Sequence, residues 1–205
     1  MVEVVYNGFW WEIKNLPEND PFVIEYWELG PVYWQQWRNF NWEWVDQIKN
    51  VIEQIRTNPT NRRIIVSAWN PAQIDKMLLP PCHAFFQFNV DTTNNVLNLQ
   101  LYQRSADMFL GVPFNIASYS TLLLLISKVT WLTPGVFTHT LGDAHIYNNH
   151  VDQVNLQLSR EPFPLPELKI LKDIKTLEDL EQLEWSDFEL LNYISHDRIV
   201  APVAV

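Results

Sequence analysis

The sequence predicts an α+β protein, because strand patterns and helix patterns mix along the chain without strict alternation. Polar and apolar residues alternate through 86–90 and again through 97–102, which is typical of two half-buried strands. The stretch 116–131 is instead apolar almost throughout and is followed by Pro134-Gly135, as expected for a buried helix. We therefore expect a mixed sheet packed against a central buried helix, in a single domain covering residues 1–205.

The other elements follow in chain order. Residues 1–28 are rich in aromatic side chains and show no clear period, so we expect an atypical N-terminal segment there. Apolar residues at helical spacing predict an amphipathic helix from Trp44 to Ile55, ended by Asn58-Pro59. Shorter patterns predict a strand at 64–69, a turn at 91–95, a strand at 136–140, a helix at about 145–159 and a strand at 168–171.

Composition limits the classes of function. A hydrophobic content of 47% excludes a disordered chain. The net charge of −10 argues against general nucleic-acid binding, because phosphate backbones favour basic surfaces. The longest apolar run, Leu122–Ile126, is too short to span a bilayer, and no secretory signal pattern opens the chain. With a single cysteine as well, the sequence predicts a cytoplasmic protein that does not enter a membrane.

That cysteine is Cys82, in the turn Pro80-Pro81-Cys82-His83. A lone thiol cannot serve a disulfide framework, so it is either a small buried hydrophobe or a reactive group. The polar run Gln103-Arg104-Ser105-Ala106-Asp107 ends the following strand and brings an arginine within reach. A cationic neighbour lowers the pKa of a thiol, which favours the interpretation of Cys82 as a nucleophile. The five histidines lack i, i+4 pairing, so the sequence does not favour a metal site.

Several long segments resemble the thymidylate synthase family. They are Asn61-Arg62-Arg63-Ile64-Ile65-Val66-Ser67-Ala68-Trp69-Asn70-Pro71, the Pro-Pro-Cys-His turn, Tyr102-Gln103-Arg104-Ser105, Phe109-Leu110-Gly111-Val112-Pro113-Phe114-Asn115-Ile116-Ala117-Ser118-Tyr119 and Ala201-Pro202-Val203-Ala204-Val205. The resemblance runs almost without gaps from about Leu29 to Val205. It implies a thymidylate synthase fold and a homodimer formed through the sheet faces.

The resemblance also implies the reaction, which is the methylation of dUMP to dTMP with 5,10-methylenetetrahydrofolate as carbon donor and reductant. The chemistry of a thiol agrees with this. A pyrimidine ring accepts nucleophiles at C6, and addition of a thiolate there makes C5 ready to attack a one-carbon unit. Cys82 matches the family's nucleophile, and the resemblance places Arg104, Tyr33 and His83 beside it as catalytic residues.

The substrate-binding residues implied by the resemblance are Arg62, Arg63, Gln103, Arg104, Ser105, Asn115, His145 and Tyr147. Arg62 and Arg63 would reach the nucleotide phosphate in the partner subunit, although a bare pair of arginines is also typical of a solvated surface. Asn115 would hold the uracil N3/O4 edge, whereas relatives that act on cytosine nucleotides have aspartate there. Without the resemblance, Asn115 would be interpreted as a helix N-cap.

Folate-binding residues implied by the resemblance are Asp107, Trp11, Gly111 and Val205. Asp107 would hold the pterin ring, and a solvated loop acid is the alternative interpretation. Trp34 and Leu141 stand where the family pattern has glycine, so we expect bulky side chains near the site.

The family's upstream phosphate-loop arginine and catalytic glutamate are not recognisable, which implies a chain shortened at its N-terminus. Glu3 resembles the local pattern of that glutamate only faintly. Three interpretations therefore stay open: a thymidylate synthase, a hydroxymethylase of dUMP or dCMP, and a catalytically impaired scaffold that binds nucleotide and dimerises.

Overall fold

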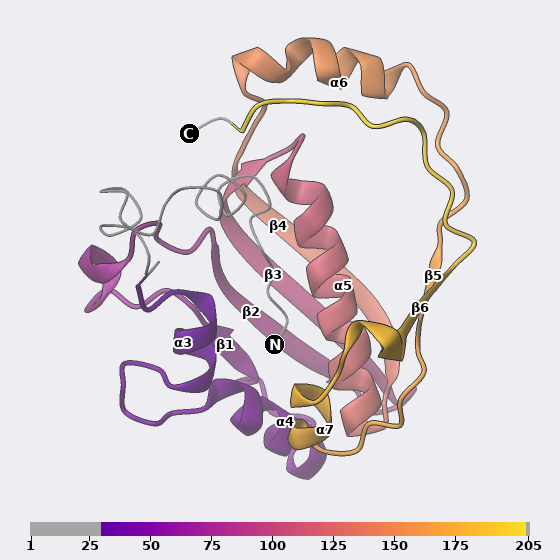
Figure 1. Ribbon diagram of the computed structural model, residues 1–205. Helices are drawn as coiled ribbons and strands as arrows, with labels where there is room; N and C mark the ends of the chain where they lie inside the picture. The colour runs from indigo at the N-terminus through magenta and orange to yellow at the C-terminus, as the bar shows by residue number, and fades with distance from the viewer. Residues whose placement is uncertain (1–29, 204–205) are drawn as a thin grey trace.

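The computed structural model describes residues 30–203 and contains a four-stranded mixed sheet. The strands are β1 (Ile65–Ser67), β2 (His83–Asp91), β3 (Val96–Asp107) and β4 (Thr133–His145), and they lie in the order β1-β2-β3-β4. The first three are antiparallel, and β4 runs parallel to β3 (Figure 1). The expected α+β class with a mixed sheet is confirmed.

The parallel pairing of β3 with β4 requires a crossover, and the helix α5 (Gly111–Thr130) supplies it. Figure 1 shows α5 lying along one face of the sheet. One side of α5 packs into the core through Tyr119, Leu123, Ile126 and Val129, whereas Phe114 on another side is 62% exposed. By length and composition alone, α5 is apolar enough to cross a membrane. A helix that packs against a sheet in a protein core has the same apolar composition, and α5 packs in this way.

The core lies between the sheet and two helices. Leu97, Leu99 and Leu101 alternate along β3 and are fully buried, as are Phe86 and Phe88 on β2. Burying these large side chains is the main favourable term in folding. The second helix of the core is α4 (Gln47–Thr57). It contributes a row of buried apolar residues, Ile48, Val51, Ile52 and Ile55.

The remaining elements surround the sheet. The helix α3 (Tyr33–Arg38) precedes α4, and η1 (Ile74–Lys76) lies between β1 and β2. After β4 come η2 (Asn148–His150), α6 (Val151–Leu158), α7 (Leu177–Glu181) and η3 (Trp185–Asp187). The strands β5 (Glu167–Ile170) and β6 (Phe188–Leu191) form a separate antiparallel pair.

Several expected boundaries were wrong. The helix expected from Trp44 begins only at Gln47, because the Asp46 side chain caps it by accepting from Lys49 N. The strand expected at 64–69 is limited to Ile65–Ser67. The strand expected at 136–140 extends over Thr133–His145, because β4 follows β3 in register to its end.

Two errors concern site residues. Asn115 does not open a helix, since α5 begins at Gly111 and carries Pro113 in its first turn, where a missing N–H costs little. Asn115 therefore lies in the second turn and is buried. His145, expected to start a helix, is the last residue of β4, because it pairs with Asp107 of β3.

Candidate active site

Cys82 lies directly before β2 and is fixed through its backbone. Its carbonyl accepts a hydrogen bond from Arg104 N at 2.8 Å, and its own N–H donates to Tyr33 Oη at 2.8 Å. Tyr33 Oη also accepts from His83 N at 3.3 Å. The tyrosine hydroxyl therefore fixes the turn at the start of β2 by binding the backbone N–H groups of both Cys82 and His83.

The position of Tyr33 depends on a buried cluster of amide side chains that the sequence analysis did not find. Gln36, on the same helix, donates to Pro31 O and to Gln73 Oε1, both at 2.7 Å. Asn70 Nδ2 donates to Gln36 Oε1 at 3.1 Å. Buried amides stabilise a structure only when they are paired, and these hydrogen bonds join α3 to the loop before η1.

Arg104 is held against the cysteine turn, as expected. Its Nε donates to Pro81 O at 3.0 Å and its Nη2 to Pro80 O at 2.8 Å. The guanidinium carbon lies 5.6 Å from the centre of the Trp69 ring, which is a cation–π contact. The positive charge is thus fixed beside the thiol.

The net effect on the thiol is opposite to the sequence-based expectation. Burial raises the pKa of Cys82 above its ordinary value, and the charge of Arg104 opposes this only in part. The physical reason is that burial disfavours the thiolate more than one neighbouring cation stabilises it. Cys82 is therefore a thiol in this structure, and it must lose its proton to act as a nucleophile.

His83 is half-buried behind this turn, and its ring Nε2 is fully buried. Burial lowers its pKa to about 4, and the Asn115 amide acts in the opposite direction. Within residues 30–203 its Nε2 has no hydrogen-bond partner. Its ring lies edge-on to Tyr119 with the centroids 5.1 Å apart. The imidazole is therefore neutral at pH 7.

Gln103 continues the leucine row of β3 on the core side and is 3% exposed. Its Nε2 donates to Ser105 O at 2.9 Å and to Asn115 Oδ1 at 3.0 Å. Its Oε1 lies 2.8 Å from Nε2 of His139, a residue of β4 that the sequence analysis missed. We call Gln103, Asn115 and His139 the amide relay. A polar residue on the strand that pairs with β3 was the only sequence signal for His139.

The ends of β3 and β4 bring four further predicted residues together. The register pairs Ser105 with Asp143 and Asp107 with His145. Asp107 Oδ1 accepts from Phe109 N at 3.0 Å and so forms the turn that leads into α5. The His145 and Tyr147 rings lie edge to face, with the centroids 5.0 Å apart.

The position of Gly142 agrees with close backbone approach. A Cβ on Gly142 would lie 2.8 Å from Arg104 O, so the pairing of β3 with β4 requires glycine there. At Gly111 the space is less restricted, because a Cβ there would make ordinary contact with Asp107 Cβ at 3.4 Å. Trp34, expected near the site, is 62% exposed and faces the Arg38 guanidinium at 5.1 Å. Leu141 is half-buried opposite Gln103.

Arg62 and Arg63 are not brought to Cys82 of the same chain. Both are exposed, and Arg62 O accepts from Gln87 Nε2 in the middle of β2. Since Ile65 pairs with Gln87, the register continued outward places Arg63 level with Asn89. At about 3.3 Å per residue, this is roughly 20 Å along the strand from Cys82.

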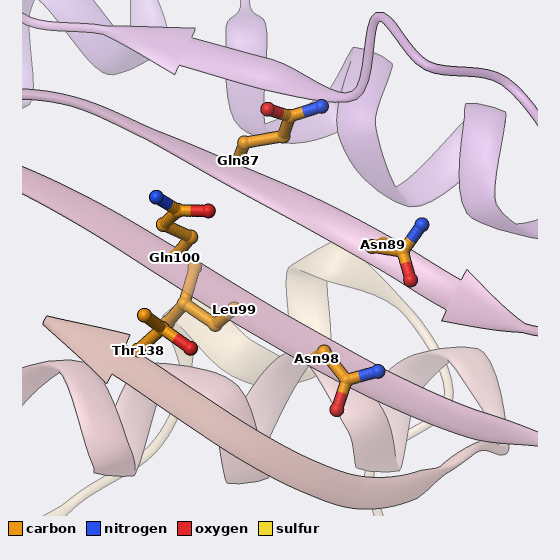
Figure 2. A pocket seen from close by; sticks show the side chains of 6 residues that line it. All are labelled: Gln87, Asn89, Asn98, Leu99, Gln100 and Thr138. Atoms are coloured by element: carbon orange, nitrogen blue, oxygen red, sulfur yellow. The ribbon is translucent and has the colours of Figure 1, made fainter.

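The face of the sheet opposite α5 forms a second polar region, which we call the outer sheet face (Phe85, Gln87, Asn89, Asn98, Gln100, Tyr102 and Thr138). Part of this face lines a pocket of about 300 Å³. Figure 2 shows the side chains that line it, which are amides of β2 and β3, Leu99 and Thr138 of β4. At one end of this face the Phe85 and Tyr102 rings stack with their centroids 5.7 Å apart.

Three predictions lie outside the described residues, namely Trp11, Val205 and the weak candidate Glu3. Among residues 30–203, no group of three or more His, Cys, Asp or Glu side chains could hold a metal ion. The described site thus combines a thiol, an adjacent fixed cation and the amide relay, whose two amides are buried. Such a site can add sulfur to a polar planar ring that carries an anionic group.

Comparisons with known proteins agree with this chemistry. The family model for thymidylate synthase matches residues 7–205, which extends further toward the N-terminus than the resemblance from Leu29. Over 94% of its length, the chain is 55% identical to the thymidylate synthase of Malacoplasma penetrans and 52% identical to that of Mycoplasma pneumoniae. The identity to the enzyme of Mycoplasma mobile is 56%. The chain spans 64–65% of the length of these relatives.

Proposed function

The chain belongs to the thymidylate synthase family, and from that premise we propose that it methylates dUMP to dTMP through a Cys82 adduct at uracil C6. The observation that best supports this is the fixed contact between Arg104 and the Cys82 turn, with hydrogen bonds of 2.8 and 3.0 Å. The folate co-substrate, 5,10-methylenetetrahydrofolate, would supply both the methylene carbon and the hydride.

Each described residue then has a chemical task. The Cys82 thiol gives its proton to solvent as its sulfur bonds to C6, and the π electron pair of the C5=C6 double bond moves toward O4. Arg104 stabilises the forming thiolate and would bind the nucleotide phosphate together with Ser105. Tyr33 Oη fixes the turn that carries the sulfur by accepting from the backbone N–H groups of Cys82 and His83, and the neutral His83 ring lies beside it. Asp107 and Gly111 would border the folate, and His145 and Tyr147 the deoxyribose.

The proposal includes a homodimer joined through the outer sheet face. This face mixes amides with the aromatic pair Phe85 and Tyr102, a composition that suits a subunit interface. Arg62 borders the face through its contact with Gln87. Arg62 and Arg63 lie far from their own Cys82, which fits arginines that serve the partner's nucleotide. The proposal also includes a cytoplasmic location and a single domain over residues 1–205.

The test is release of tritium from 5-labelled dUMP in the presence of methylenetetrahydrofolate, with identification of the product. We expect tritium release and dTMP from the chain as it stands, and neither from Cys82→Ala. Release with 5-hydroxymethyl-dUMP as product would instead support the hydroxymethylase interpretation. Nucleotide binding without release would support the impaired scaffold and contradict the proposal.

Substrate choice can be tested at Asn115. Asn115→Asp should shift preference toward dCMP, because a protonated carboxyl can donate to cytosine N3 while its other oxygen accepts from the exocyclic amine. The relative Kd of dUMP and dCMP measures this shift. An unchanged ratio would count against the contact between Asn115 and the uracil edge.

A further inference from the structure

The polarity of the amide relay follows from a backbone carbonyl. Ser105 O can only accept a hydrogen bond, so the group of Gln103 that lies 2.9 Å from it must be the NH₂. The same NH₂ donates its second hydrogen to Asn115 Oδ1 at 3.0 Å. The oxygen end of Gln103 is then left facing His139 Nε2 at 2.8 Å. Because an amide oxygen only accepts, His139 must carry a hydrogen on Nε2.

This polarity determines which end of Asn115 is available for other contacts. Oδ1 is the end that accepts from Gln103, so Nδ2 is directed away from the relay. Reversing the Asn115 amide would direct its hydrogens against those of Gln103. Both residues are at least nine-tenths buried, at 3% and 9% exposure, so water cannot easily replace the lost hydrogen bond.

The two pyrimidine bases require opposite orientations of this amide. Uracil presents an N3–H donor beside the O4 acceptor, and it pairs with an asparagine whose Nδ2 faces O4 and whose Oδ1 faces N3–H. Cytosine presents an N3 acceptor beside an exocyclic NH₂ donor, so it pairs with the reversed amide. An asparagine with fixed polarity therefore discriminates between the bases, and a freely rotating one does not.

We propose that His139 is a positioning residue for base specificity, which fixes Gln103 and thereby holds the Asn115 amide in the orientation that selects uracil over cytosine. The inference rests on the proposed function, because it assigns Asn115 to the nucleobase. His139 would not touch the substrate. Its own position is fixed by the parallel register of β4 on β3 and by the Phe137 ring, which stacks on it with the centroids 5.5 Å apart.

The experiment compares two variants of His139. His139→Phe keeps a ring beside Phe137 but removes the donor, so Gln103 is free to turn. His139→Gln can place an amide N–H where the imidazole Nε2–H was, so it should restore the relay. Titration calorimetry with dUMP and with dCMP gives the ratio of the two Kd values for each chain. We expect the preference for dUMP to fall about tenfold in His139→Phe and to stay within about twofold of wild type in His139→Gln.

A second measurement, hydrogen exchange of side-chain amides, tests the hydrogen bonds of the amide relay without a ligand. In ¹⁵N-labelled protein, the side-chain NH₂ of Gln103 should exchange slowly in the wild type and in His139→Gln, and quickly in His139→Phe. The buried side-chain NH₂ of Gln36 is the matched control, because its partners Pro31 and Gln73 do not touch His139. Its exchange should be the same in all three chains, and faster exchange at both glutamines would indicate general loosening and overturn the inference.

Other results separate this inference from the proposed function. If dUMP binds and the Kd ratio of His139→Phe equals that of the wild type, the role of His139 is overturned while the proposed function stands. Equal losses in His139→Phe and His139→Gln would also overturn it, since the hydrogen bond would not be the cause. If the wild-type chain binds neither nucleotide, the proposed function fails together with the base discrimination.

Discussion

The two faces of the sheet both carry amide side chains, yet they use them differently. On the side of α5, Gln103 and Asn115 of the amide relay are buried and His139 is half-buried, and the hydrogen bonds of 2.8–3.0 Å that join them are made within the chain. On the outer sheet face, Gln100 and Asn89 are exposed, and the Gln100 Nε2 contact with Thr140 Oγ1 is long, at 3.4 Å. The inner amides are held in one geometry by short hydrogen bonds, whereas the exposed amides of Asn89 and Gln100 can pair with another surface.

The difference shows why the same residue type has two roles in one strand. Gln100 and Gln103 are three positions apart on β3, so they point to opposite faces of the sheet. The buried one must be fully paired, because an unpaired buried amide is costly, and its neighbours therefore become part of the site. The exposed one has no such requirement, and its place in an interface depends on a partner.

The largest expected effect is on the inner side. Cys82→Ala should lower kcat by at least about 10³-fold, because the nucleophile is lost. The Kd for dUMP should change by less than about tenfold, because Arg104 and the amide relay remain. Single-turnover kinetics and calorimetry measure the two quantities. Turnover close to wild type would show that the inner side does not supply the nucleophile.

The outer sheet face is tested by a charge. Gln100→Lys should weaken the dimer by about 100-fold or more, since burying an unpaired ammonium at an interface is unfavourable. Activity should fall with the dimer, because Arg62 and Arg63 would no longer reach the partner's site. Sedimentation over a range of concentrations measures the dimer Kd.

The control for this test is Gln157→Lys on α6, an exposed position away from the sheet, which should leave the dimer unchanged. A Gln100→Lys chain that dimerises like the wild type would show that the outer sheet face is not the interface.

His83, on the inner side, should also make the free energy of unfolding fall at acid pH. The folded pKa of His83 is about 4, against 6.5 for an ordinary histidine. Below pH 6.5 the His83 imidazole is protonated in the unfolded chain, whereas in the folded chain it stays neutral until about pH 4. The contribution of His83 is therefore complete above pH 6.5, and about 3 kcal/mol of the free energy of unfolding is lost by pH 4.

Denaturant unfolding at several pH values, compared with His83→Phe, measures this contribution. The variant should show a shallower loss over the same range, because it lacks the titrating group. Parallel pH profiles for the two chains would contradict the burial of a neutral His83.

The smallest expected effect comes from an experiment that combines a variant of the outer face with a variant of the inner side. An Arg62→Ala/Arg63→Ala chain and a Cys82→Ala chain should each be nearly inactive. In the mixed dimer one site carries both lesions, while the other combines an intact cysteine with intact partner arginines. Activity should therefore return to about half of the wild-type value per mixed dimer. With subunit exchange verified, failure to recover activity would place the arginines in their own subunit's site or in a structural role.

Some of this could be predicted from the residues alone. Alternation placed β2 and β3 and the side of each strand that faces the core, because a strand's side chains repeat every two residues. The position of Arg104 next to the cysteine turn also followed, because a hairpin with a turn at 91–95 brings the ends of β2 and β3 together. The boundaries of α5 and β4 could not be predicted, because they depend on Pro113 in a first turn and on pairing with a distant strand.

The sequence by itself determined the strands β2 and β3, the amphipathic α4, the place of Arg104 beside the cysteine turn, and the resemblance that the family match confirmed. Only the tertiary structure decided the protonation of Cys82, because burial depends on everything that packs around the thiol. Only the tertiary structure joined His139 to Gln103, 36 residues away along the chain. No local pattern records that contact, because it arises from the parallel register of β4 on β3 after α5 has crossed the sheet.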